Sequence, residues 1–526
     1  MIAQADMARR FVAALAAAGV RDLVVSPGSR STPLVLAALD CGDLRCRAII
    51  DERSAAFFAL GMAKRSGRPV AALCTSGTAG AHYYPAAIEA AYSYTPLVLI
   101  TADRPAELQG CGAPQTIDQI DLFHKHVRAA VAVDPDDDAA AAKVATAVAA
   151  ARSPVPGPVH LNVRLRKPLE TRASQAVVPP IPRTYAAPHA DPPADAVRAL
   201  ADACAAERGV IVAGPAPLAQ RRARAAVEAL ACATGYPLVA EAASQLKFGV
   251  DVSIDGFPAL LSAEAARERL RPELILQLGA MPVSTAWREY QTRWADVPRW
   301  VIAPWGRPDP LRTATAHVAA DVGRTAAAVA EAIGCVRAPT AWATAWRAGA
   351  LAPGPAADAV RTAVRALPPA GVVCAGNSLP IRWLDAACSA RDTDADVWSQ
   401  RGVAGIDGLI SGAAGAAAAG DSPTLLLVGD VSFAHDIGGL AAARDVRTPL
   451  AIVVLDNGGG RIFDELPVAA AVAPDDLSRW WTTPPRVDLA AAARAFGVPY
   501  APMDDASLAA AFERRGPTLL HAEVGA

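Results

Sequence analysis

The sequence predicts an α/β protein of three domains, each built on an open parallel β-sheet. Short apolar strands alternate with alanine-rich helical stretches along the whole chain, which is typical of parallel sheets covered by helices. Two proline-rich stretches, 177–193 and 337–355, divide the 526 residues into three segments of ordinary domain size. We therefore expect domains at 1–182, 183–340 and 341–526.

The strands are predicted from apolar runs that end at small or polar residues. The first segment contains DLVVS, AIID, PVAALCT and PLVLITA, and the second contains GVIVAG, PLVAEA, ELILQLG and RWVIAP. The third contains GVVCAG, TLLLVGD and PLAIVVLDN. Before the first strand, FVAALAAAGV predicts an amphipathic helix that ends at Gly19 rather than a signal peptide.

The composition argues against several classes of protein. The net charge is −2, from 50 basic and 52 acidic residues, so no overall field favours nucleic acid. The nine cysteines are scattered without a C-x-x-C pair or zinc spacing, which indicates reduced thiols in a cytoplasmic protein. No apolar run reaches the roughly 18 residues of a membrane span.

One stretch of the sequence is similar to another. Residues 70–103 align without gaps on 423–456, at an offset of 353 positions. In both stretches Thr-Pro-Leu opens the second strand, beginning at Thr95 and at Thr448. A shared βαβ geometry could produce this similarity by itself, but we favour two related domains that flank a third.

Polar residues follow two neighbouring strands of the third segment. Asp430 ends the first of them, and Asn457 lies 27 residues further on. Ligands of open parallel sheets bind at the carboxyl ends of the strands, and carboxylate, amide and carbonyl oxygens suit Mg²⁺. The glycines at 458–460 allow a sharp turn that brings the Gly459 carbonyl toward the same ion. We expect a Mg²⁺–diphosphate site; a plain surface turn or a dinucleotide loop is the alternative.

This spacing resembles that of thiamine-diphosphate enzymes, and the whole chain is similar to the 2-succinyl-5-enolpyruvyl-6-hydroxy-3-cyclohexene-1-carboxylate synthase family of menaquinone biosynthesis. The motifs that carry the resemblance are SPGSRSTPL, DERSAAFFALGMAK, TSGTAG, TADRP, GNSLPIR, QRGVAGIDG, GDVSF and NGGGRIFDELP. The resemblance implies a pyrimidine-binding, a middle and a diphosphate-binding domain. It also implies a cofactor held between two subunits, and hence a homodimer or a dimer of dimers.

The resemblance further implies which residues hold the cofactor. Glu52 of the DERS motif would share a proton with the aminopyrimidine ring and so activate thiamine diphosphate. Read alone, Glu52 could simply be an acid in the first turn of a helix. The implied metal is Mg²⁺ or Mn²⁺, bound by Asp430, Asn457 and Gly459. The remaining cofactor contacts are expected from Asn377, Ser378, Gly402, Ile406 and Ser432.

The implied substrates are 2-oxoglutarate, which would lose CO₂, and isochorismate, which would accept the succinyl carbanion. Their carboxylates require arginines, although any one arginine read alone is a solvated surface charge. The expected substrate contacts are Ser29, Arg30, Arg104, Gln115, Ser378, Arg382 and Arg401, with an apolar wall of Ile462, Phe463 and Leu466.

The chain departs from the family pattern at three positions. Pro114 stands where asparagine is usual, Thr285 where lysine is usual, and His82 where asparagine is common. Arg288 is a candidate replacement for the missing cation. These departures keep two alternatives open: a thiamine-diphosphate-dependent 2-oxoacid decarboxylase or carboligase with another acceptor, and an inactive cofactor-binding scaffold.

Overall fold

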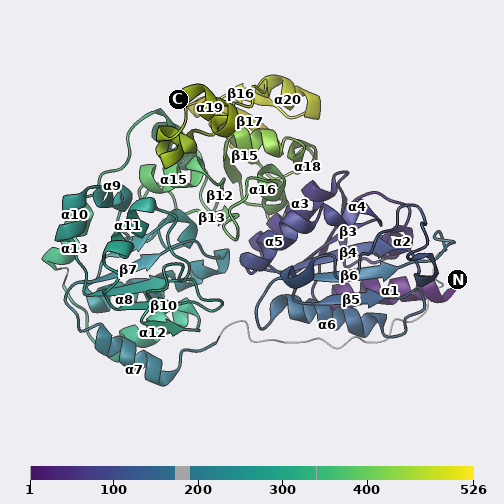
Figure 1. Cartoon of the computed structure of the whole chain (residues 1–526), viewed down its shortest axis with the longest axis horizontal. Helices are drawn as coiled ribbons and strands as arrows, with labels where there is room; N and C mark the ends of the chain where they lie inside the picture. The colour runs from purple at the N-terminus through teal and green to yellow at the C-terminus, as the bar shows by residue number, and fades with distance from the viewer. Residues whose placement is uncertain (1, 172–189, 339, 526) are drawn as a thin grey trace.

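The computed structural model describes residues 2–171, 190–338 and 340–525, which form three α/β domains, each on a parallel sheet. In Figure 1 the first domain lies on the right, the middle domain on the left and the third domain above them. The predicted boundary at residue 182 lies outside the described residues, and the exact domain limits stay predictions. No described helix is both long and apolar enough to cross a membrane.

The described part of the first domain contains a sheet in the strand order β2-β1-β3-β4-β6-β5. Two of its strands, β5 and β6, were not predicted. The predicted position of the strand AIID, residues 48–51, is wrong. The strand spans Arg45–Ala48, and Asp51 instead caps a helix by accepting the Ser54 N–H. The strands are β1 (Asp22–Val25), β2 (Arg45–Ala48), β3 (Val70–Cys74), β4 (Leu97–Asp103), β5 (Ala130–Val133) and β6 (Pro158–Arg164).

The third domain repeats this topology, with the strand order β13-β12-β14-β15-β17-β16. β4 and β15 have the same length and lie at the 353-residue offset of the internal similarity, as two related domains predict. The strands are β12 (Val372–Ala375), β13 (Asp396–Ser399), β14 (Thr424–Gly429), β15 (Leu450–Asp456), β16 (Tyr500–Pro502) and β17 (Pro517–Glu523).

The middle domain has the strand order β11-β10-β9-β7-β8. Its strands are β7 (Gly209–Ala213), β8 (Leu238–Ala240), β9 (Leu274–Leu278), β10 (Arg299–Ile302) and β11 (Ala316–Val318). A short helix at 341–345 lies within the second proline-rich stretch. Its Trp342 makes an edge-to-face contact with Trp346, which packs against Trp287 and Tyr290 of the middle domain.

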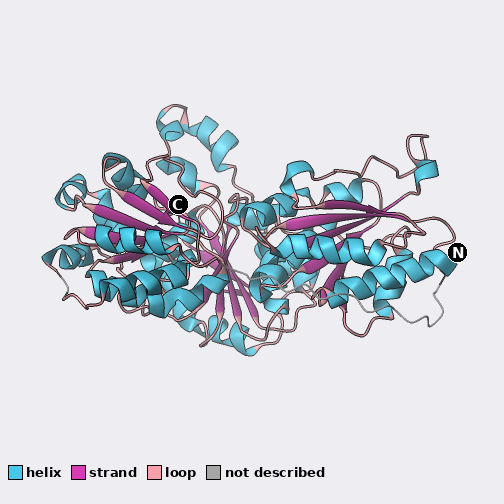
Figure 2. Ribbon diagram, turned by 90° about the horizontal axis from the view of Figure 1, so that it is seen from below, coloured by secondary structure: helices cyan, strands magenta, loops and turns pink. Residues whose placement is uncertain are grey.

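Helices cover the faces of the sheets (Figure 2). The helix predicted before the first strand is confirmed. The first domain contains α1 (Ile2–Ala17), α2 (Thr32–Leu39), α3 (Glu52–Ser66), α4 (Thr78–Ala81), α5 (Tyr84–Tyr92) and α6 (Ala140–Arg152). The middle domain contains α7 (Ala194–Ala203), α8 (Arg224–Thr234), α9 (Phe257–Ser262), α10 (Glu264–Arg269), α11 (Thr285–Arg293), α12 (Val322–Ile333) and α13 (Ala341–Ala345). The third contains α14 (Pro355–Ala366), α15 (Leu379–Ala387), α16 (Leu409–Ala418), α17 (Asp430–His435), α18 (Gly439–Ala443), α19 (Pro474–Leu477), α20 (Leu489–Phe496) and α21 (Asp505–Glu513).

The first and third domains meet where α3 packs against α16, and one apolar core continues through both domains. Glycines allow the two backbones to touch. A Cβ atom on Gly61 would lie 1.9 Å from the Gly412 carbonyl oxygen, and one on Gly415 would lie 2.0 Å from that of Phe58. No side chain fits at either contact.

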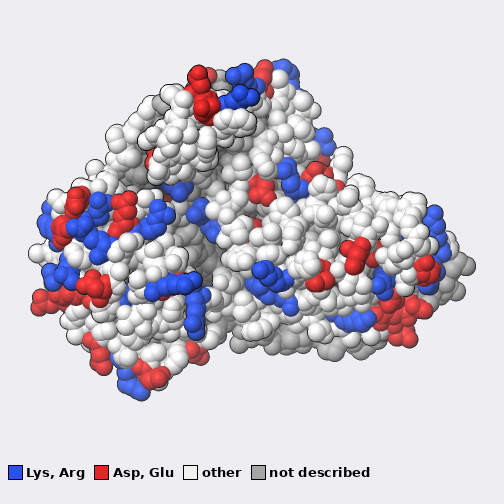
Figure 3. All heavy atoms as spheres, viewed as in Figure 1, with Lys and Arg blue, Asp and Glu red and all other residues white. Residues whose placement is uncertain are grey.

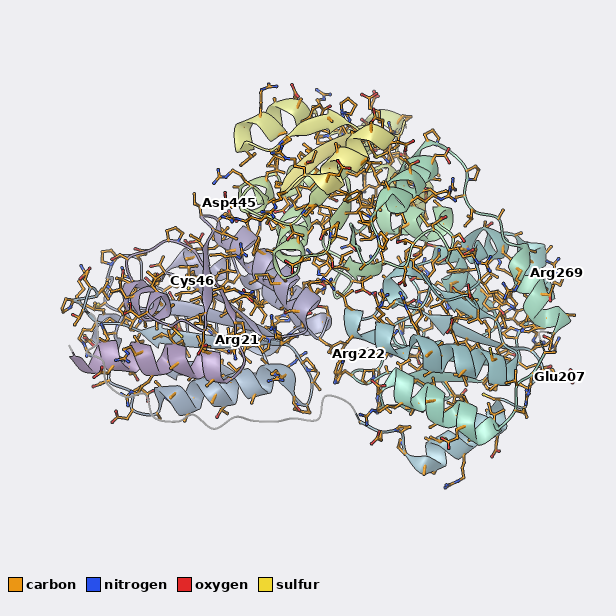
Figure 4. The ribbon with its side chains drawn as sticks, turned by 180° about the vertical axis from the view of Figure 1, so that it is seen from behind. Arg21, Cys46, Glu207, Arg222, Arg269 and Asp445 are labelled. Carbon is orange, nitrogen blue, oxygen red and sulfur yellow. The ribbon has the colours of Figure 1, made fainter. Side chains whose placement is uncertain are left out.

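The middle domain contacts both of its neighbours through polar groups. Arg221 and Arg224 form ion pairs with Asp394 of the third domain, at 2.8 and 2.6 Å. Arg222 lies on the side of the middle domain that faces the first (Figure 4). Trp305 donates its indole N–H to the Pro154 carbonyl of the first domain at 3.1 Å. A hollow with basic side chains at its rim lies where the three domains meet (Figure 3).

We predict that Gly61→Ala destabilises the protein because the new methyl group would overlap a main-chain oxygen of α16. Overpacking of this kind lowers the free energy of unfolding by about 2 kcal/mol or more. Gly42→Ala is the control, since a Cβ atom there has nothing within 4 Å, and it should change stability by no more than about 0.5 kcal/mol. Urea unfolding of both variants checks this, and equal stabilities would contradict it.

Candidate active site

A pocket opens at the carboxyl ends of β14 and β15, which pair side by side up to Gly429 and Leu455. This pairing brings Asp430 and Asn457, each the residue after its strand, to the same edge of the sheet. The pocket is lined by Asn377, Ser378, Leu379, Pro380, Trp383, Gly429, Asp430, Val431, Ser432, Leu455, Asn457, Gly459, Gly460 and Arg461.

The three predicted metal ligands all line this pocket, and their chemistry fits a hard cation such as Mg²⁺. Asp430 is 5% exposed and accepts the N–H groups of Val431 and Gly459, at 2.8 and 2.6 Å. Burial raises the pKa of its carboxyl. A cation bound beside it would oppose this effect and favour the ionised form. The Asn457 side chain forms no hydrogen bond within the described ranges. A Cβ atom on Gly459 would lie 2.6 Å from the Thr482 carbonyl oxygen, so only glycine fits.

The same pocket is suited to an anion. Ser378 occupies the N-cap position of α15 without a side-chain capping hydrogen bond, the first residues of the helix line the pocket, and a helix N-terminus of this kind attracts phosphate. Ser378 has φ +69°, an uncommon conformation for a residue with a side chain, and such strain is concentrated at binding sites. Ser432, in the first turn of α17, also lines the pocket.

Asn377 holds the third-domain loop 400–405 in place. Its amide donates to the carbonyls of Gln400 and Gly405, at 2.9 and 2.6 Å, and its oxygen accepts from Arg401 at 2.9 Å. The side chain is therefore already bonded within the chain. Its predicted contact with the diphosphate stays a prediction, and the structure adds an ordering role that the sequence did not reveal.

Arg382 and Arg401 lie close to each other, beside two buried acids, Glu241 and Asp385. Burial lowers the pKa of both arginines, and the charge of Glu241 opposes this effect. Burial also raises the pKa of Asp385, and it raises that of Glu241 to about 8, to which the charge of Asp385 contributes. In their ionised forms the two acids oppose the effect of burial on the arginines without cancelling it, and no sequence pattern pointed to them.

Glu241 also fixes the start of α11. Its carboxylate accepts the N–H groups of Val283 and Ser284, at 2.8 and 2.9 Å. Arg288, one turn further along α11, lies near enough that its charge contributes to lowering the pKa of Arg382. Thr285 begins the helix and is exposed. The candidate replacement cation is thus beside the arginine pair, and its role stays a prediction.

A second group of predicted substrate residues lies in the first domain. Arg104 donates to the Ser76 hydroxyl and, at 3.0 Å, to the Pro114 carbonyl. Gln115 donates to the Ser76 carbonyl at 3.2 Å. Arg30 is buried, and its pKa is lowered by burial and by the charge of Arg104. These contacts bring Arg30, Arg104 and Gln115 together, and Ser29 precedes Arg30 in the same turn.

Glu52 is the first residue of α3, and it does not line the pocket that contains Asp430. The next residue, Arg53, reaches the carbonyl of His435 at 3.1 Å, at the opposite end of α17 from Asp430. Glu52 adds to burial in raising the pKa values of Cys74 and Tyr83, which shows that it lies near these two side chains. Within one chain Glu52 therefore lies outside the pocket that contains Asp430.

The predicted apolar residues follow the glycine turn. Ile462 and Phe463 are half-buried within the 3₁₀ turn Arg461–Glu465, and Leu466 after it is 43% exposed. Ile406 is half-buried in the loop before α16. Their contacts with a cofactor or substrate stay predictions. His82 is exposed at the end of α4.

A buried polar network supports the first-domain group, and no motif in the sequence indicated it. His160 bonds to the Thr101 hydroxyl at 2.8 Å, and this hydroxyl donates to Asn162 at 2.8 Å. Gln119 donates to Asn162 at 3.0 Å and accepts the Gly77 N–H at 2.8 Å. The network therefore connects the sheet to the turn that follows β3, beside Ser76.

We predict that His160 makes the protein less stable as the pH falls from about 6.5 to 4. Burial lowers the pKa of its ring to about 4 from an ordinary 6.5, so the unfolded chain takes up a proton first. Below both values the loss is about 3 kcal/mol. His160→Gln should lack this part of the pH dependence in urea unfolding, whereas the exposed control His124→Gln should keep it. Equal slopes for wild type and His160→Gln would contradict the prediction.

Two known protein families match the first and the third domain separately. The family described as "Thiamine pyrophosphate enzyme, N-terminal TPP binding domain" matches residues 5–122, and its C-terminal counterpart matches 383–522. A solved benzoylformate decarboxylase from Polynucleobacter necessarius superposes with a TM-score of 0.79 at 15% identity, covering 99% of this chain and 98% of its own. This likeness confirms the predicted fold.

Whole-chain relatives are more specific. The 2-succinyl-5-enolpyruvyl-6-hydroxy-3-cyclohexene-1-carboxylate synthase of Sorangium cellulosum is 43% identical, with 98% of this chain and 92% of the relative covered. The synthase of the same name from Geobacillus thermodenitrificans is 39% identical, with 93% and 88% covered. The resemblance inferred from the motifs is thus confirmed, and the chain belongs to the 2-succinyl-5-enolpyruvyl-6-hydroxy-3-cyclohexene-1-carboxylate synthase family of thiamine-diphosphate enzymes.

Proposed function

We propose that the protein decarboxylates 2-oxoglutarate and transfers the remaining succinyl group to isochorismate, a step of menaquinone biosynthesis. The observation that carries this proposal is the convergence of Asp430, Asn457 and Gly459 on one pocket beside the N-terminus of α15. The names of the whole-chain relatives support the same reaction. All nine cysteines are free thiols, which supports a reducing, cytoplasmic location.

In this proposal the third domain holds the charged end of the cofactor. Asp430, Asn457 and Gly459 would bind Mg²⁺ or Mn²⁺, and Ser378, Ser432 and the N-terminus of α15 would face the diphosphate. When bound, thiamine diphosphate supplies a carbon nucleophile that can attack a 2-oxoacid. Glu52 would hold a proton on the aminopyrimidine ring and so control the ionisation of the cofactor.

The two arginine groups would bind the carboxylates of the substrates. Arg382 and Arg401 come from the third domain, and Arg30 and Arg104 from the first. Each charge-assisted contact with a carboxylate contributes about 1.5–3 kcal/mol. The chain has a net charge of −2, so anionic substrates must be recognised by such local groups rather than by an overall field.

We further propose that each active site combines the first domain of one subunit with the third domain of another. The separation of Glu52 from the Asp430 pocket within one chain supports this arrangement. Exposed apolar side chains lie close in sequence to both groups, as an interface requires: Ile50, two residues before Glu52, is 84% exposed, and Trp480, two residues before the Thr482 that packs on Gly459, is 63% exposed. A homodimer is the smallest such assembly, and a dimer of dimers would preserve it.

Mass spectrometry with and without isochorismate tests the reaction, using purified protein, thiamine diphosphate, Mg²⁺ and 2-oxoglutarate. A succinyl adduct of isochorismate that requires the cofactor is the expected product. Succinic semialdehyde alone would instead indicate a decarboxylase with another acceptor, consistent with Pro114 and Thr285. Cofactor binding without any consumption of a 2-oxoacid would indicate a scaffold.

We predict that Glu52→Gln lowers kcat by about 10²- to 10⁴-fold, because an amide cannot exchange the required proton. Cofactor binding should persist, and quenching of tryptophan fluorescence can measure it, since Trp383 lines the pocket. Glu107→Gln, which changes an exposed glutamate paired with Arg166, should keep full activity. Full activity of Glu52→Gln would refute the proposed role.

Mixing two inactive variants tests the shared site. Glu52→Gln and Asp430→Ala should each be inactive alone. If each site uses two subunits, a heterodimer of the variants has one site with both residues intact, and random mixing should restore about a quarter of the wild-type activity. No recovery after subunit exchange, verified by native mass spectrometry, would show that both residues act within one chain.

A further inference from the structure

Two charged residues of the first domain contact the third-domain loop 400–405 and the end of the strand before it. Lys64, near the end of α3, and Glu89, in α5, form an ion pair of 2.7 Å with only 10% and 2% of their side chains exposed. Lys64 also donates to the Ser399 carbonyl at 2.8 Å and lies over the ring of Trp398. The pair is therefore built into the contact between the two domains.

The Glu89 carboxylate binds the backbone of the loop directly. Its two oxygens accept consecutive N–H groups, from Gly402 at 3.1 Å and from Val403 at 2.9 Å. A Cβ atom on Gly402 would lie 2.7 Å from the Glu89 carbonyl oxygen, so the close approach requires glycine at this position. One carboxylate therefore holds the backbone of Gly402 and of Val403, and a shift of the loop would break both hydrogen bonds together.

The loop presents one of the two third-domain arginines. Arg401 directly precedes Gly402, and its guanidinium donates to Asn377, which lines the Asp430 pocket. Its Nε is buried and has no hydrogen-bond partner within the described ranges. Gln400, on the other side of Arg401, is buried and donates to the Gly408 carbonyl at 3.0 Å. The direction of Arg401 is therefore set by the fixed backbone on either side of it.

We propose that Glu89, paired with Lys64, is a positioning residue for substrate binding: it fixes the loop that directs Arg401 toward the dicarboxylate 2-oxoglutarate. This inference rests on the proposed function. Glu89 itself touches the loop backbone and Lys64, and it acts only through Arg401. A buried ion pair contributes little to stability compared with an apolar pair of similar volume, so its value here is the geometry it imposes.

Glu89→Gln tests the inference because it keeps the size of the side chain but removes its charge and one strong acceptor. We expect KM for 2-oxoglutarate to rise about tenfold with kcat little changed, as for the loss of a binding contact. The dissociation constant of glutarate, an unreactive dicarboxylate, should rise by a similar factor in calorimetry on the loaded enzyme. Amide exchange of a peptide covering 399–405 should become faster without any ligand.

Arg65→Met is the matched control. Arg65 follows Lys64 in α3 and also reaches the third domain, with an ion pair of 3.5 Å to Asp396 and a hydrogen bond to Ser422, and within the described residues it forms no hydrogen bond or ion pair with loop 400–405. This variant should lower the melting temperature and leave KM, glutarate affinity and loop exchange unchanged. If Glu89→Gln yields no folded protein, Lys64→Met is judged by the same three measurements.

The outcomes distinguish a failure of the positioning role of Glu89 from a failure of the proposed function. Unchanged glutarate affinity and loop exchange in Glu89→Gln would overturn the positioning role, as would equal losses of affinity in Glu89→Gln and Arg65→Met. Failure of the wild-type protein both to bind glutarate and to consume 2-oxoglutarate would instead overturn the proposed function, and this inference with it. Faster loop exchange together with weaker glutarate binding in Glu89→Gln alone would support the inference.

Discussion

Close backbone contact between α3 and α16 is the constraint on which the rest of the structure depends. Gly61 lies against Gly412, and Gly415 against Phe58, so the first and third domains share one core rather than touching through side chains. Both functional regions are attached to this contact. α3 begins at Glu52, and α16 follows the loop that contains Arg401 and Ile406. Their relative positions are therefore set by main-chain geometry, which cannot relax by a change of rotamer.

The candidate site gathers cations in a chain that carries a slight net negative charge. Burying Arg382 and Arg401 carries a desolvation cost, part of which the nearby acids Glu241 and Asp385 oppose when they are ionised. These acids come from the middle domain and from α15, so the domain that matched the family motifs least still shapes the electrostatics of the site. Glu241 does so twice, because its carboxylate also anchors the helix that carries Arg288.

The sequence predicts best the strands that are continuous apolar runs and the polar residues that directly follow them. Buried strands such as β14 and β15 are continuous apolar runs, and their parallel pairing necessarily brings Asp430 and Asn457 together. Strands without a continuous apolar run were missed or displaced: β2 reads RCRA and is largely exposed, and the interior strand β6 reads PVHLNVR, in which polar residues interrupt the pattern. Glu89 could not be recognised either. Its partner N–H groups lie more than 300 positions away, and a lone glutamate in an alanine-rich helix reads as a solvated charge.

The length of α3 has a mechanical consequence. Glu52 opens the helix and Lys64 stands near its other end, 12 residues on, a span of about 18 Å at 1.5 Å per residue. In the proposed dimer, the Glu52 end serves one catalytic centre, while the Lys64 end braces the loop that serves the other. Within each subunit, helix α3 would then connect the two catalytic centres. In that arrangement, a shift of α3 along its axis at the Glu52 end would also move Lys64 and the loop that contributes Arg401 to the other centre.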